Sequence, residues 1–486
     1  MRARFTIFIF VLPAGLAFEA RGEVGSQLLQ PEDDPQGRLA SVAIHGDYVI
    51  IGLPPICGGC PGGEAYVFRR IGDTWIQDAK LLPSEGDAFD FFGTSVAISG
   101  NTIVIGAPHR SIDTTGFGKA YLFSKTADGW LEEAILIPSP RIFGDGFGHS
   151  VAISGDLLAI GAPYVSLPAE AAYVNVYRKK PSLHLCDFHS DCELVGLSEC
   201  KNGFCLEWVE EASLLPTSVS SGQYFGLKLS VDENRIAVGW PYYGPPGQRT
   251  GAVFVFAKPA DVWVEEAAII PSNAYHGFFF GGAVALQGDS LAVGAEGAYD
   301  AALNSSFAFV FRFLNGTWTQ GARLWPNDPR AAVFGASIAH CAGAVVVGAP
   351  GDDDPVYETG ALYLFRGSGS NWIRALRIPH PEPVFGGALG QTLAMSSSTV
   401  IANAWAFSLD RDCGGAPEPD VCERPGDLDA DGDTDHEDLL EIVRCLTGPQ
   451  TTQVGTPCCF FDMDFNDRVD LRDFALVQPF LMEQVK

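Results

Sequence analysis

The sequence predicts an all-β fold, a seven-bladed β-propeller, followed by a small α-helical domain with paired calcium loops. Three observations support this prediction. A two-strand unit recurs seven times, a second strand pair rich in aromatic residues follows most copies, and an acidic segment near the C-terminus has the spacing of a calcium loop. Four strands per repeat of about fifty residues is typical of a propeller blade.

The N-terminus has the pattern of a secretory signal peptide, predicted to span residues 1–20. Arg2 and Arg4 precede an apolar run from Phe5 to Leu16, and small residues follow it. No uninterrupted apolar run is long enough to cross a bilayer, so no transmembrane segment is predicted. We therefore expect the mature protein to be secreted or displayed at the cell surface.

The composition excludes some partners. The chain has 59 acidic and 31 basic residues and a formal net charge of −28. This charge argues against nucleic acid as a partner and against simple electrostatic binding to anionic membranes.

The repeat unit is clearest in residues 91–108. Two short apolar strands, Ser95–Ile98 and Ile103–Ile105, flank a Ser-Gly-Asn turn, and Gly and Asn tolerate the positive φ of a tight hairpin. The Phe of each Phe-Gly pair, or its equivalent, falls at Arg38, Phe92, Phe147, Phe225, Phe280, Phe334 and Phe385. One interval is long, because a Cys-rich insert at 181–207 interrupts the third repeat.

A second pair of strands follows each hairpin except the last. In the second repeat it comprises 118–123 and 134–138, with Trp130 between them. The seventh repeat stops near Leu409 without this pair, and Ser26–Pro31 looks like a fourth strand. We therefore predict that the N-terminal strand completes the last blade and closes a propeller over 23–410. The third strand of that blade is either residues 404–407 or missing.

The Phe-Gly, Ser-Val-Ala and Gly-Ala-Pro elements resemble FG-GAP repeats, which form the propeller of integrin α-chains and a family of bacterial exported proteins. The resemblance implies a binding or adhesion role, with a carbohydrate or protein ligand held by the propeller loops. Integrin-type repeats often carry a calcium loop between the first two strands. Here that place holds only a short turn, which cannot supply six or more oxygen ligands, so no calcium is expected there.

Twelve cysteines in an exported chain favour disulfides over thiol chemistry. The insert is expected to be a two-disulfide microdomain, with a zinc site as the alternative. Cys57 and Cys60 are expected to form a local staple. Cys341 replaces a turn residue and is a candidate free thiol.

A linker at 411–425 leads to the acidic domain at 426–486. Its first loop places carboxylates at positions 1, 3, 5, 7, 9 and 12 with Gly432 at position 6, which is the EF-hand spacing for Ca²⁺. The predicted ligands of this loop are Asp427, Asp429, Asp431, Asp433, Asp435 and Asp438.

A second loop starts 35 residues later, with Asp467 where Gly is usual. Its predicted ligand positions are Asp462, Asp464, Asn466, Arg468, Asp470 and Asp473, of which the seventh position coordinates through its carbonyl. A helical pattern follows each loop. The duplicated loop-helix unit resembles the dockerin domain, which implies two Ca²⁺ ions and docking onto a cohesin-like protein module.

Two functions compete. The first is a non-catalytic binding protein with a calcium-dependent docking module. The second is a hydrolase or lyase acting on extracellular polysaccharide. The histidines do not cluster, with His45 and His340 assigned to the same hairpin-turn position of different repeats. The Asp352–Asp354 run is expected to be a solvated loop, with a weak cation site as the alternative. No nucleophile-and-base signature stands out, so binding is predicted and no catalytic residue is assigned.

Overall fold

The computed structural model describes residues 25–31, 41–55, 62–85, 89–108, 118–138, 142, 144–164, 172–185, 200–201, 204–217, 224–245, 249–270, 277–300, 305–328, 330–341, 343–354 and 356–409. In these ranges the secondary structure is all β, with no helix. Correspondingly, this part of the chain has no long apolar helix that could span a membrane.

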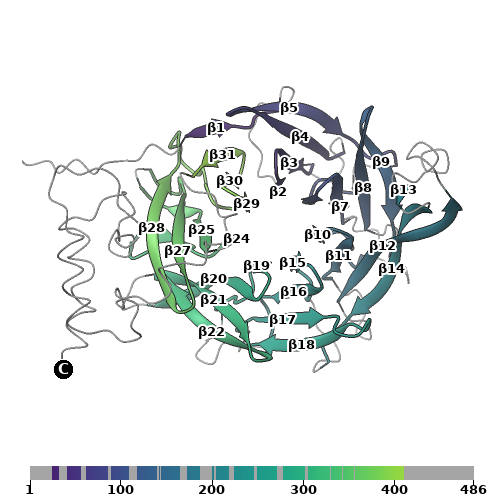
Figure 1. Ribbon diagram of the computed structural model, residues 1–486. Helices are drawn as coiled ribbons and strands as arrows, with labels where there is room; N and C mark the ends of the chain where they lie inside the picture. The colour runs from purple at the N-terminus through teal and green to yellow at the C-terminus, as the bar shows by residue number, and fades with distance from the viewer. Residues whose placement is uncertain are drawn as a thin grey trace, which may run out of the picture.

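Seven sheets stand around a common centre, and the first strand of each lies nearest to it (Figure 1). The first three blades contain β2 (Ser41–His45), β3 (Tyr48–Leu53), β4 (Glu64–Ile71) and β5 (Thr74–Leu81); β6 (Ser95–Ser99), β7 (Thr102–Ala107), β8 (Lys119–Thr126) and β9 (Gly129–Leu136); and β10 (Ser150–Ser154), β11 (Leu157–Ala162), β12 (Tyr173–Leu185), β13 (Cys200–Lys201) and β14 (Phe204–Leu214). Within each blade the strands pair antiparallel with their neighbours in the chain, except that β12 pairs with β14 and β13 lies outside β14.

The remaining blades repeat this order. They contain β15 (Lys228–Asp232), β16 (Arg235–Trp240), β17 (Ala252–Ala257) and β18 (Val264–Ile269); β19 (Ala283–Gln287), β20 (Ser290–Asp300), β21 (Ser305–Leu314) and β22 (Thr317–Leu324); β24 (Ser337–Cys341), β25 (Ala344–Ala349), β27 (Ala361–Ser368) and β28 (Asn371–Pro379); and β29 (Leu393–Ser396), β30 (Thr399–Ala402), β31 (Trp405–Ser408) and β1 (Ser26–Leu28). A small extra sheet pairs β23 (Ala331–Ala332) with β26 (Gly351–Asp352).

The seventh blade is assembled from both ends of the described chain. β1 pairs antiparallel with β31, with Gln27 opposite Ala406. This confirms the predicted closure by the N-terminal strand and shows that residues 405–408 form the third strand. Because the terminal strand occupies the outer edge of this blade, neither end of the repeat array leaves an unpaired blade.

The hydrophobic core lies between the blades. Seven clusters of buried residues each combine side chains from two adjacent sheets, and the cluster between blades seven and one includes Leu29, Val49 and Ile401. Both faces of most strands are therefore covered, which explains their nearly continuous apolar sequences.

The glycines of the repeat are needed for close approach of neighbouring blades. A Cβ on Gly106 would lie 1.9 Å from the Gly148 carbonyl oxygen of the next blade. Gly148 has φ of +88°, a conformation that a side chain rarely adopts. The adjacent Phe147 is fully buried. The Phe-Gly pair of one blade is thus the contact surface for the Gly-Ala-Pro end of the preceding blade.

In the seventh repeat the Phe-Gly pair was assigned wrongly. Leu389 is fully buried and the Ser337 Oγ donates to the Gly390 carbonyl at 2.6 Å, as other repeat serines do to the glycine of a Phe-Gly pair. The equivalent pair is therefore Leu389-Gly390, 55 residues after Phe334 (389 − 334). Phe385 is instead 75% exposed and stacks on Tyr357. A chance Phe-Gly pair four residues upstream concealed the regular period.

A β-bulge in the fourth strand of blades one to six places one extra residue beside the next blade. In blades one to four this residue is acidic: Asp78, Glu133, Glu211 and Glu266. The indole Nε1 of the following blade donates to three of these carboxylates, from Trp130 at 3.2 Å, Trp263 at 3.1 Å and Trp318 at 2.8 Å. The bulge thus directs a carboxylate across the blade interface.

The Cys-rich insert extends a blade. Strands β12 and β14 continue through residues 181–185 and 204–207, so the ends of the predicted insert belong to the third sheet. Cys205 is disulfide-bonded. Cys341 is also disulfide-bonded, so its assignment as a candidate free thiol was wrong.

Candidate functional site

The two faces of the propeller differ in the connections that they carry. Links between the second and third strands, and from one blade to the next, lie on one face, which we call the loop face. The hairpin turns lie on the opposite hairpin face. Eleven residues separate β7 from β8 on the loop face, whereas two separate β6 from β7 on the hairpin face. Long connections on a rigid scaffold are where binding residues concentrate, which makes the loop face the candidate binding face.

A continuous row of aromatic side chains crosses the loop face of blades three to five. Ring centroids are 5.3 Å apart between His149 and Tyr164, 6.1 Å between Tyr164 and Tyr224, 4.8 Å between Tyr224 and Tyr242, and 5.5 Å between Tyr242 and Phe279. All five side chains are partly buried. We call these five residues the aromatic arc.

The repeat fixes where the arc residues stand. Tyr224 and Phe279 immediately precede the buried Phe225 and Phe280 and have φ of 74° and 53°. A bulky residue in this left-handed conformation is strained, and such strain concentrates at functional positions. The strain also recurs at the same repeat position in other blades, as at Phe91 with φ of 56°, so part of it belongs to the scaffold.

The other two tyrosines follow the end of the second strand. Tyr164 comes directly after Pro163, and Tyr242 comes directly after Pro241. Four of the five arc residues therefore stand before a Phe-Gly pair or after the proline that ends the second strand, and His149 stands directly after the Phe147-Gly148 pair. Sequence reasoning missed it, although an aromatic residue at one or both of these positions was visible in the repeats of blades three, four and five.

Lys228 and Glu296 lie at the inner end of the loop face. Lys228 starts β15, an innermost strand, and is open to solvent. The protein around it nevertheless desolvates the amine and lowers the pKa of Lys228, with the charge of Glu296 acting in the opposite direction. Burial raises the pKa of Glu296, and the charge of Lys228 opposes that shift. The two groups thus feel each other's charge.

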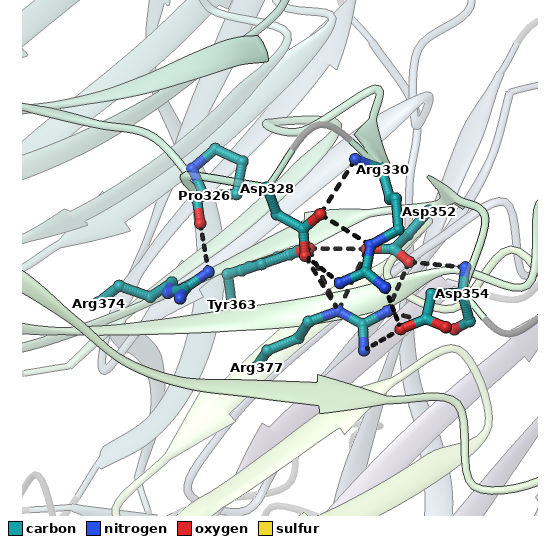
Figure 2. A network of polar contacts seen from close by, with 8 residues as sticks. All are labelled: Pro326, Asp328, Arg330, Asp352, Asp354, Tyr363, Arg374 and Arg377. Carbon is teal, nitrogen blue, oxygen red and sulfur yellow. Dashed lines mark hydrogen bonds and ion pairs between the residues drawn. The ribbon is translucent and has the colours of Figure 1, made fainter. Parts of the chain in front are cut away.

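The Asp352–Asp354 run belongs to an ion network rather than a solvated loop. Arg377 Nη2 contacts Asp352 Oδ1 at 2.6 Å, and the Tyr363 hydroxyl donates to Asp352 Oδ2 at 2.7 Å (Figure 2). Asp352 is fully buried. Asp354 accepts from Arg330 Nη1 at 2.8 Å. The expectation of a solvated loop is therefore wrong for Asp352.

Asp328 belongs to the same network, which explains its lowered pKa. Burial would raise the pKa of Asp328, but hydrogen bonds from Arg330 and the charges of Arg330 and Arg377 bring it below the usual value. Two arginines thus neutralise the three carboxylates of Asp328, Asp352 and Asp354 in part (Figure 2). Within the described ranges no group of three or more His, Cys, Asp or Glu side chains could hold a metal ion. The weak cation site considered for this run has no support there.

A cavity of about 520 Å³ opens beside the rim between blades three and four. Its lining includes Arg178, Lys180 and Lys258 around Glu211. The amine of Lys258 lies 2.7 Å from a Glu211 oxygen, and Arg178 and Lys180 lie at 3.2 and 3.3 Å. Burial opposes ionisation, but hydrogen bonds from Lys258, Trp263 and Arg178 lower the pKa of Glu211 to about 2. The three basic side chains thus form ion pairs with Glu211, and the pair with Lys258 links blade three to blade four.

His340 does not occupy a hairpin turn. It pairs with Val345 inside β24, at the position that Ile98 and Ile153 fill in other blades. Burial lowers the pKa of His340 to about 4. Its Nε2 lies 3.5 Å from the Ser290 Oγ, and the Trp372 ring packs beside it. His340 is therefore a largely neutral core residue, and the earlier assignment was wrong.

The predicted calcium ligands, Asp427 to Asp438 and Asp462 to Asp473, lie outside the described residues. The same holds for the signal peptide, the linker, and the Cys57 and Cys60 staple. These predictions remain predictions.

Five segments match a family model described as FG-GAP repeat: residues 75–123, 130–175, 208–256, 263–311 and 318–365. Each begins at a tryptophan in, or directly before, a fourth strand and ends in the third strand of the next blade. No curated protein matches the chain in sequence.

Solved structures also resemble the chain, among them the crystal structure of Chaetomium thermophilum Sqt1. The identity is 12%, the TM-score is 0.41, and the likeness covers 76% of this chain and 80% of that one. A similarity this weak does not bear on function.

Proposed function

This chain is a seven-bladed β-propeller of FG-GAP repeats, and we propose that it is an exported, non-catalytic binding or adhesion protein whose loop face holds the ligand. The aromatic arc is the observation that carries this proposal. Partly buried aromatic rings combine a large contact area with little side-chain entropy to lose, which suits a binding surface. The opposite face has short first hairpin turns, such as the two residues between β6 and β7, and charged groups there such as Lys258 and Glu211 pair with one another.

The C-terminal segment extends this proposal. The oxygen donors of Asp427, Asp429 and Asp431, and of the corresponding residues in the second loop, suit Ca²⁺, which prefers six to eight hard oxygen ligands. Bound calcium would relieve the repulsion among the clustered carboxylates and order the segment. We propose that the ordered segment docks onto a cohesin-like protein module and so anchors the propeller outside the cell.

The loop face can be tested by immobilising the full-length protein and two variants and passing an envelope extract of the host over each. The components that each protein retains are then compared. Tyr242→Ala should lose a component that the unaltered protein retains, and Lys180→Met on the hairpin side should keep it. Retention of the same components by all three proteins would contradict the proposal.

A test of the docking segment uses far-ultraviolet circular dichroism of the full-length protein. The described residues are all β, so a helical signal that grows with added Ca²⁺ would report on residues 426–486. Asp427→Ala and Asp462→Ala should each lower the calcium affinity of that response. A spectrum insensitive to Ca²⁺ and to chelator would rule out the calcium module.

The alternative function is a polysaccharide-active hydrolase or lyase docked through the same segment. One observation favours it: the pKa of Lys228 is lowered, which is a property of lysine bases. This activity would release reducing ends from an extracellular polysaccharide such as xylan, and Lys228→Ser would abolish the release. The binding function predicts retention of such a polymer without cleavage.

A further inference from the structure

Lys228 occupies a position that in other blades holds the ring together. The side chains of Ser41, Ser95 and Ser150 donate to the glycine carbonyl of the next Phe-Gly pair at 2.6 to 2.8 Å, and Ser337 makes the same bond. In blade four the residue at this register is Lys228, opposite Gly239. Lys228 makes no such bond between blades, and its side chain is exposed.

The amine of Lys228 gains no partner in return. Among the described residues it makes no hydrogen bond, and no acidic group lies within 4 Å of it, although Glu296 is close enough to influence its charge. Glu296 itself stands where other repeats have the proline of Gly-Ala-Pro. Lys228 thus stands where four other blades have a serine, and Glu296 stands where other repeats have a proline. The two charged side chains do not form an ion pair with each other. A bound ligand would explain both departures from the repeat.

The aromatic arc adjoins these two residues. An added Cβ on Gly297, next to Glu296, would lie 2.7 Å from the Phe279 ring. The Tyr242 ring lies 5.5 Å from that of Phe279, and Tyr224 is four residues before Lys228. Aromatic rings therefore flank the ammonium of Lys228, which only donates hydrogen bonds, and the carboxylate of Glu296, which only accepts them when it is ionised.

We propose that Lys228, Glu296, Tyr224, Tyr242 and Phe279 bind a neutral oligosaccharide at the inner end of the loop face. The inference rests on the proposed binding function and specifies its ligand. Each sugar hydroxyl both donates and accepts, which matches an ammonium and a carboxylate held apart. The C–H faces of sugar rings pack on aromatic side chains. The net charge of −28 disfavours a polyanionic chain.

Isothermal titration calorimetry of the full-length protein with cellohexaose, xylohexaose, mannohexaose and laminarihexaose tests the proposal. At least one hexaose should bind with a sub-millimolar Kd. Tyr242→Ala and Lys228→Ser should each weaken that binding about tenfold. Lys180→Met should change it less than twofold. Sulfated and uronate polymers serve as anionic probes and should bind more weakly than the neutral chain.

Lys228→Ser also separates a ligand-binding role from a structural one. Serine restores the residue that donates between blades elsewhere, so the Tm of this variant should rise while its affinity falls. A lower Tm would mean that Lys228 supports the fold, and would overturn the proposal.

Two further outcomes would also overturn the inference. In the first, none of the four hexaoses binds at millimolar concentration, or only an anionic polymer binds. In the second, a hexaose binds and both variants retain its full affinity. The proposed function would survive the first outcome if Tyr242→Ala still lost a retained envelope component, so the two failures are distinguishable.

Discussion

At the scale of single residues, a few repeat positions depart from the consensus, and each departure has a different physical meaning. Lys228 replaces a serine and leaves an amine without a partner among the described residues. His340 replaces an isoleucine and is held as a largely neutral ring in the core. Equivalent positions of different blades share one backbone structure and differ in their side chains. Comparing them therefore shows the effect of the side chain alone.

The pH dependence of stability follows for His340. Its pKa is about 4 in the folded protein against an ordinary value of 6.5, so the unfolded chain takes up a proton first as the pH falls. The stability associated with the neutral ring is complete above pH 6.5 and is lost between pH 6.5 and 4. The loss amounts to at most about 3 kcal/mol.

His340→Ile should remove this part of the acid sensitivity. Urea unfolding at pH 7 and pH 4 measures the effect, with His45→Gln, at an exposed histidine, as the control variant. An equal loss of stability on acidification in His340→Ile and the unaltered protein would show that His340 is not responsible.

At the scale of elements, the bulged fourth strand is the device that joins one blade to the next through polar contacts. Glu266 accepts from the Trp318 indole at 2.8 Å and pairs with Arg235 at 3.1 Å. In blade five the bulge residue is Gly321, and the next indole, of Trp372, donates to the Gly369 carbonyl instead. The Trp372 indole thus finds an acceptor without a bulge carboxylate, whereas the buried Nε1 of Trp208, which follows the Glu133 bulge, makes no hydrogen bond among the described residues.

A double-mutant cycle tests the contact between Glu266 and Trp318. Glu266→Ala should destabilise the protein by about 1–2 kcal/mol, because it leaves the Trp318 indole without its acceptor and leaves Arg235 paired with Asp289 alone. Trp318→Phe should remove only the indole donor. The coupling energy from denaturant unfolding should be about 1 kcal/mol in favour of the pair. Purely additive losses would show that the bulge has no energetic role across the interface.

At the scale of the whole molecule, stability depends on closure of the ring. The seven core clusters form a closed series, and the one between blades seven and one is completed by Leu29 beside the N-terminal strand. Gln27 also makes two reciprocal hydrogen bonds with the Trp75 backbone, at 2.7 and 2.8 Å. A few residues from one end of the chain therefore fix the last blade to the first.

Leu29→Ala should destabilise the propeller by about 2–5 kcal/mol, because the side chain is fully buried and leaves a cavity. The neighbouring Leu28 is 40% exposed, so Leu28→Ala is a matched control with a loss within about 0.5 kcal/mol. Thermal unfolding of both variants measures the difference. Equal effects would mean that the N-terminal segment does not hold the ring closed.

Much of the fold could be predicted from the sequence because the signals are local and repeated. The hairpin turns, the alternating strands and the Phe-Gly and Gly-Ala-Pro elements identify the blades one at a time, and Ser26–Leu28 takes the place expected of a fourth strand. The seventh Phe-Gly pair was misplaced at Phe385 because a motif search cannot tell a buried pair from an exposed one.

The sequence by itself determined the seven repeats, the closed ring and the roles of its glycines, since turn chemistry and strand periodicity are written in adjacent residues. Only the tertiary structure decided which polar side chains meet. Tyr164, Tyr224 and Phe279 belong to one arc, Asp352 is neutralised by Arg377, and the charge of Glu296 acts on Lys228. These relations join residues of different strands and blades, and no local pattern records the distance between them.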